Sequence, residues 1–66
     1  MVLSDTGRYM VMTVDNGECR EYEDRIKALK FFEKSLKVYG HVVFSVHVGG
    51  SFRDTMVWKN GNLERK

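Results

Sequence analysis

The 66-residue sequence contains no proline, a single cysteine and no long hydrophobic run. With Cys19 as the only cysteine, an internal disulfide and a cysteine-based metal site are both excluded. A lone thiol is typical of a reducing, intracellular setting, so we expect a cytoplasmic protein. No apolar stretch approaches the roughly 18 residues of a membrane span. The first five residues lack the basic start and apolar region of a signal peptide.

Residues that support catalysis or metal binding are few and poorly spaced. His41 and His47 are six positions apart on one predicted strand, so about 20 Å separates them. The segment Gly49-Gly50-Ser51 lacks the spaced Gly-Lys-Ser/Thr end of a phosphate-binding loop. No second carboxylate is positioned with Asp54 for acid–base work. We therefore expect a protein that is not an enzyme and that uses no metal or cofactor.

Residues 25–39 predict one long helix. This stretch contains no glycine or proline and several strong helix formers. Asp24 suits the N-cap position, where its carboxylate accepts from free backbone amides, and Gly40 suits the position just after the helix. An apolar stripe for packing on a sheet is formed by Leu29, Phe32, Leu36 and Tyr39.

One pair of predicted strands precedes this helix in the sequence, and a second pair follows it. Apolar residues alternate most clearly in residues 41–48, a pattern typical of a half-buried strand. Asn-Gly at 16–17 and Gly-Gly at 49–50 are strong hairpin signals, because these residues tolerate positive φ angles. The four predicted strands are residues 8–14, 18–23, 41–48 and 51–59.

The resulting element order, ββαββ, predicts an α+β fold. We expect residues 1–66 to form a single small domain, an antiparallel sheet with one helix packed on one face. Asn60-Gly61-Asn62 predicts a further turn. Residues 1–6 and 62–66 are expected to be frayed ends.

Four lysines form a row along the predicted helix. Their i, i+3, i+7, i+10 spacing places them in a stripe about 80° wide. One interpretation is a solvated face whose charge complements the helix dipole. The other is a surface that binds an acidic partner, because like charges at i, i+4 are otherwise slightly unfavourable. On the second interpretation, the predicted partner-binding residues are Lys27, Lys30, Phe31, Lys34 and Lys37.

The second face of the sheet is also rich in apolar residues. If Gly49 and Gly50 form a two-residue loop, Val48 opposes Ser51 and Val42 opposes Val57, and opposed residues share a face. A single helix covers one face, so we expect the other face to mediate self-association. A one-residue slip in register exchanges the faces. The residues predicted for self-association are Val43, Phe52, Met56 and Trp58.

These features favour a non-enzymatic, protein-binding module that modulates or inhibits a larger partner with an acidic surface. We expect a homodimer, because a chain this short buries only about 60% of its unfolded surface. The size and composition are typical of phage and mobile-element accessory proteins of the host-takeover or anti-defence type. The alternative is a small nucleic-acid-binding regulator that uses the same lysines to contact phosphates. A third interpretation is a structural subunit of a larger assembly.

Overall fold

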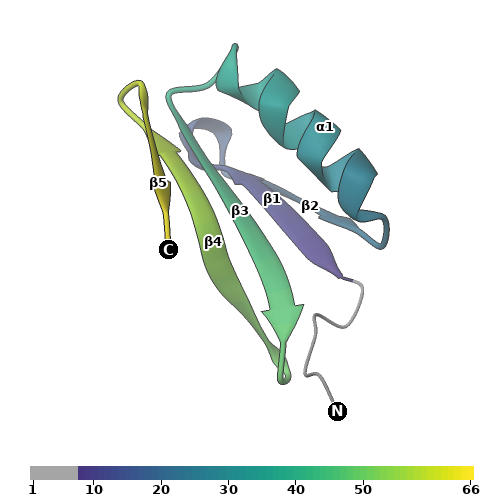
Figure 1. The fold of residues 1–66 in the computed structure, drawn as a ribbon. Coiled ribbons are helices and arrows are strands. Elements are labelled where there is room, and N and C mark those ends of the chain that lie inside the picture. Colours follow the sequence, from purple (N-terminus) through teal and green to yellow (C-terminus); the bar gives the residue numbers. More distant parts are fainter. Residues whose placement is uncertain (1–7) are drawn as a thin grey trace.

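The computed structural model describes residues 8–66, which form one five-stranded antiparallel sheet and one α-helix (Figure 1). The strand order in the sheet is β2-β1-β3-β4-β5. This arrangement confirms the predicted α+β fold and adds a fifth strand. The elements are β1 (Tyr9–Thr13), the 3-10 turn η1 (Val14–Asn16), β2 (Glu18–Tyr22), α1 (Arg25–Leu36), β3 (His41–Val48), β4 (Ser51–Lys59) and β5 (Asn62–Arg65).

Helix α1 lies over β1, β2 and β3 on one side of the sheet (Figure 1). The side chains between the helix and the sheet form the core. In it, the Phe32 and Phe44 rings pack edge-on, with their centroids 5.7 Å apart. We call this side of the sheet the helix face and the other side the open face. The buried apolar residues of the core cluster are Tyr9, Val11, Ala28, Phe32, Val42 and Phe44.

The N-terminus of α1 is capped as the sequence predicts. The Oδ1 atom of Asp24 accepts hydrogen bonds from the backbone N–H groups of Ile26, at 2.9 Å, and Lys27, at 3.4 Å. These bonds satisfy two amides that have no partner within the helix. The helix ends earlier than predicted, at Leu36, and Gly40 is not its terminating residue. Instead, the Gly40 N–H donates to Oδ2 of Asp15 at 2.6 Å.

We expect Asp24→Ala to lower the free energy of unfolding by about 1 kcal/mol, because it removes this cap. Urea denaturation followed by circular dichroism measures the loss. Asp24→Asn is the matched control, since asparagine keeps the accepting oxygen and we expect it to retain most of the stability. Equal losses in both variants would show that the cap contributes little.

The first hairpin loop is one residue longer than residues 15–17, the segment between the two predicted strands. Thr13 opposes Glu18, so four residues, Val14 to Gly17, form the loop. Two loop residues form hydrogen bonds with the segment after α1. The Asn16 side-chain amide donates to the Tyr39 hydroxyl at 3.2 Å, and the Asp15 carboxylate accepts from the Gly40 N–H. These contacts fix the α1–β3 connection against the first hairpin, which explains the longer loop.

The C-terminal residues form a strand, which corrects the expectation that 62–66 are frayed. Asn60 and Gly61 have φ angles of 53° and 81°, and this two-residue turn returns the chain along β4. β5 then pairs Leu63 with Trp58, and the Lys66 N–H donates to the Thr55 carbonyl at 2.9 Å. The predicted frayed segment 1–6 lies outside the described residues.

A β-bulge at Thr55 interrupts the pairing of β3 with β4. From the Gly49-Gly50 turn to the pair Ser45–Asp54, the register is the predicted one. Beyond that pair, Phe44 opposes Met56, so Thr55 has no partner across the ladder. The Thr55 hydroxyl instead donates to the Phe44 carbonyl at 3.2 Å. Because side chains alternate between faces, this extra residue exchanges the faces of all later residues in β4.

Candidate interaction surfaces

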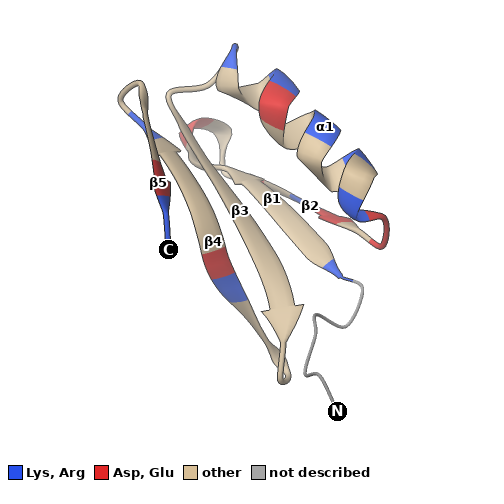
Figure 2. Cartoon of the chain, viewed as in Figure 1, with Lys and Arg blue, Asp and Glu red and all other residues tan. Residues whose placement is uncertain are grey.

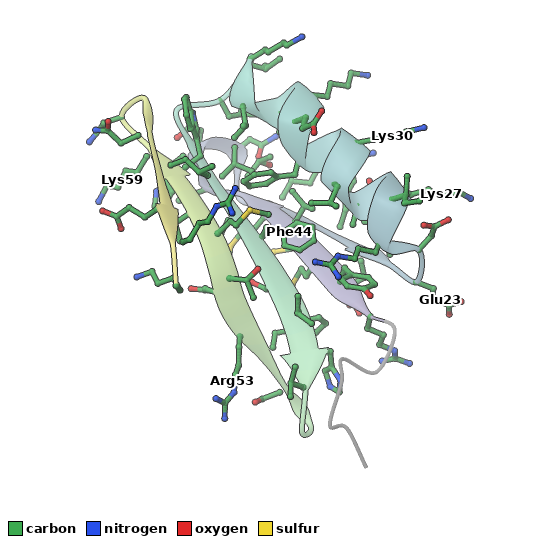
Figure 3. The ribbon with its side chains drawn as sticks, viewed as in Figure 1. Glu23, Lys27, Lys30, Phe44, Arg53 and Lys59 are labelled. Atoms are coloured by element: carbon green, nitrogen blue, oxygen red, sulfur yellow. The ribbon has the colours of Figure 1, made fainter. Side chains whose placement is uncertain are left out.

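The four lysines lie on the outer side of α1, away from the sheet. Ala28, Phe32 and Ser35 are the buried residues of the helix, and their spacing defines the side that packs on the sheet. Figure 2 shows that basic residues recur along α1, and Figure 3 shows Lys27 and Lys30 pointing away from the sheet. The exposed row comprises Lys27, Lys30, Lys34 and Lys37.

These lysines carry charge that the described part of the chain does not neutralise. Within residues 8–66 the one ion pair joins Glu18 to Arg20, at 2.9 Å, and none involves a helix lysine. Glu33 also belongs to α1 and is exposed, but it forms no ion pair with the row. The outer side of α1 is therefore a basic surface that is available to an acidic partner.

Two exposed hydrophobic side chains accompany the lysines. Ile26 is 64% exposed in the first turn of α1, and Val38 is 70% exposed just after its last turn. At 100° per residue they flank the lysine row on opposite sides. We define the outer helix surface as Ile26, Lys27, Lys30, Lys34, Lys37 and Val38. Ile26 is not among the predicted partner-binding residues, although its position four residues before Lys30 places it near the lysine row.

Phe31, a predicted partner-binding residue, lies at the border of this surface. It is half-buried, and its ring packs against the Tyr22 ring with centroids 6.0 Å apart. The Arg20 guanidinium lies over the same ring at 4.7 Å. Hydrogen bonds to Glu18 and Tyr22 raise the pKa of Arg20, so this residue stays charged. Phe31 therefore joins α1 to β2 and has a role in the fold.

The four residues predicted for self-association do not share a face. Val43 and Phe52 lie on the open face, whereas Met56 and Trp58 lie on the helix face and pack against the core cluster. The bulge at Thr55 causes this division, because it shifts the register between Phe52 and Met56. The predicted grouping of Met56 and Trp58 with Val43 is thus wrong.

The register places a different apolar set on the open face. Cys19 opposes Met12, Met12 opposes Val43, and Val43 opposes Val57. These four residues form a row across β2, β1, β3 and β4, which we call the open-face row. Val43 is buried, Met12 and Val57 are half-buried, and Cys19 is exposed. This row depends on the order of strands in the sheet, so the sequence pattern alone did not reveal it.

Three polar residues of the open face, Ser45, Asp54 and His47, contact neighbouring side chains. The buried Ser45 hydroxyl donates to Oδ1 of Asp54 at 2.9 Å. His47 packs edge-on against Phe52, with ring centroids 5.0 Å apart. Among the described residues, no group of three or more histidine, cysteine, aspartate or glutamate side chains is arranged to hold a metal ion.

A shallow hollow lies at the β2 end of the sheet and is lined by Arg8, Glu21, Tyr22 and Glu23. Its lining combines one basic side chain, two acidic side chains and one tyrosine. In residues 8–66, no helix has the length and apolar character needed to cross a membrane. Comparisons with protein-family models, with curated proteins and with solved structures found no match.

Proposed function

We propose that this protein is a non-enzymatic binding module that docks the outer helix surface on an acidic region of a larger protein and thereby modulates or inhibits it. The combination of an unneutralised lysine row with two exposed hydrophobic side chains carries this proposal. Ile26 and Val38 expose apolar surface to water, which is unfavourable. Solubility alone therefore does not account for this face of the helix.

The two kinds of side chain contribute differently to binding. Full burial of an isoleucine or valine side chain against a partner contributes about 1.5–3 kcal/mol each. The lysines steer an acidic partner toward the helix and set its orientation, which raises the association rate more than the affinity. Ile26 and Val38 lie near the two ends of α1, so the partner needs apolar contacts at both ends and acidic groups between them.

We expect Lys30→Glu combined with Lys34→Glu to leave folding intact and to abolish capture of the partner. Both side chains are exposed and form no ion pair in the described structure, so the fold does not depend on them. The measurement is a tagged pull-down from a lysate of the cell that produces the protein, quantified by mass spectrometry. A protein captured by the wild type should fall at least tenfold in the eluate of the variant.

Arg53→Glu combined with Lys66→Glu is the charge-matched control. It changes the net charge by the same amount, and both residues are exposed and belong to the β4–β5 region rather than to α1. We expect this control to capture the partner as the wild type does. Undiminished capture by the helix variant would assign the lysines to solvation alone, and equal losses in both variants would indicate a nonspecific charge effect.

The lysine row also suits phosphate groups, which makes nucleic acid the second candidate partner. Four lysine–phosphate contacts on duplex DNA predict a log–log slope of affinity against salt of about −3.6. A protein interface with apolar contacts at Ile26 and Val38 predicts a gentler slope. The acidic residues Glu23 and Asp24, beside the start of α1, disfavour a nucleic-acid backbone at that end of the helix.

A further inference from the structure

We propose that the open face pairs with the same face of a second copy, related by a two-fold axis that runs along the open-face row. This inference is independent of the outer helix surface. The row contains apolar side chains from four neighbouring strands, and helix α1 lies on the opposite side of the sheet (Figure 1). In a two-fold contact of this kind, each apolar residue of the row packs near its own copy.

The charges beside the row identify the second copy as the partner. On β4, Lys59 lies on one side of Val57 and Asp54 lies on the other, since Lys59 opposes His41 and Asp54 opposes Ser45. His41 and Ser45 are each two residues from Val43, so both charged positions lie about 7 Å from the row. The Lys59 and Asp54 side chains are exposed.

A two-fold rotation about the row exchanges its two sides. It therefore brings Lys59 of one copy over the partner subunit's Asp54, and the same contact occurs a second time by symmetry. The Asp54 Oδ1 atom accepts from Ser45, which leaves Oδ2 to accept from the lysine ammonium. The apolar row thus meets itself, and the pairing of Lys59 with Asp54 offsets the one like-charge approach on the axis, that of Glu64, which opposes Val57 on β5, to its own copy.

Association with a second copy also stabilises a fold of this size. Chains of about this length bury a small share of their surface and are often stabilised by association. Sheets that pack face to face lie about 10 Å apart, a distance that side chains such as Met12 and Val57 fill from both sides. The pairing leaves both α1 helices on the outside of the dimer.

The test measures the mass of the protein in solution by sedimentation equilibrium over a range of concentrations. The wild type should have twice the 7.7 kDa mass of one chain. Lys59→Asp places two like-charged pairs in the interface, and we expect the dissociation constant of the dimer to rise about tenfold, which is about 1.4 kcal/mol. Asp54→Lys should have the same effect or a larger one.

The double variant Lys59→Asp with Asp54→Lys restores both pairs with their charges exchanged, so it should dimerise more tightly than either single variant. It loses the Ser45–Asp54 bond just as Asp54→Lys does, which makes that comparison a fair one. Arg53→Asp is the control on the same strand, because Arg53 opposes Val46 on the helix face and should leave the dimer unchanged. Circular dichroism verifies that each variant folds.

A wild type that stays monomeric at every concentration would overturn the proposal. So would a dimer in which the double variant is weaker than both single variants, since the charge pairing would then be wrong. Loss of the dimer in Arg53→Asp alone would place the contact on the helix face.

Discussion

Deletion of Thr55 is expected to leave the protein folded, with Met56 and Trp58 still on the helix face. Thr55 is the unpaired residue of the bulge between β3 and β4. Without it, the ladder becomes regular and still pairs Phe44 with Met56 and Val42 with Trp58, and opposed residues share a face. We expect the free energy of unfolding to fall by about 1–3 kcal/mol, the cost of the hydrogen bonds that Thr55 forms with the Phe44 carbonyl and the Lys66 N–H.

Thr55→Ala is the matched control, because it keeps the chain length and the bulge. It removes the hydroxyl that donates to the Phe44 carbonyl, together with one methyl group, at a cost of about 1 kcal/mol for the hydrogen bond. Urea denaturation, followed by the fluorescence of the single tryptophan, Trp58, measures both variants. A deletion variant that loses its cooperative unfolding transition, or whose emission maximum shifts to the longer wavelengths of an exposed tryptophan, would show that Thr55 is not the extra residue of the bulge.

Phe44→Ala is expected to unfold much of the population at 25 °C. Phe44 is 2% exposed on the central strand, contacts Phe32 and Tyr9, and lies between α1 and the sheet (Figure 3). Truncation of a buried phenylalanine costs about 3–5 kcal/mol. A domain of this length has a total stability of roughly 3–10 kcal/mol, so the loss consumes much or all of it. Thermal denaturation followed by circular dichroism measures the effect.

Phe52→Ala provides the comparison with the same residue type on the other face. Phe52 is half-buried near the tip of the β3–β4 hairpin and packs on His47. We expect the free energy of unfolding to fall by less than about 1.5 kcal/mol, because truncation of this half-buried ring removes little buried apolar surface. Equal effects for the two phenylalanines would contradict the division of the sheet into a helix face and an open face.

Local chemistry accounts for the features that the sequence predicted correctly. The Asp24 cap requires one side chain and the amides next to it, and the turns at Gly49-Gly50 and Asn60-Gly61 require residues that tolerate positive φ. The outward position of the lysines follows from the helix period, once the apolar stripe is known. Each of these features depends on a few neighbouring residues.

The features that the sequence did not predict depend on residues far apart in the chain. The bulge at Thr55 arises where the β3–β4 ladder must satisfy both a tight turn and the packing of Trp58 against the core cluster, and the alternation of apolar residues in β4 does not mark it. β5 is a short polar segment that gains its order by pairing with β4. The open-face row forms because β1 lies between β2 and β3 in the sheet.

The two proposed surfaces lie on opposite sides of the molecule. A dimer through the open face would present two outer helix surfaces, one on each side. If the larger partner is itself oligomeric or carries repeated acidic segments, the two sites act as a bivalent binder and raise the apparent affinity without new contacts. The helix variant and the open-face variants separate these effects, because each changes one surface.

The proposed binding of the outer helix surface to a protein, rather than to a nucleic acid, can be tested in one experiment. It is a pull-down from the lysate of the producing cell with the wild type and with Lys30→Glu/Lys34→Glu, each with and without nuclease, read by mass spectrometry. We expect one protein that the wild type enriches equally with and without nuclease, and that the helix variant fails to enrich. Enrichment that disappears with nuclease, or that the helix variant retains, would contradict it.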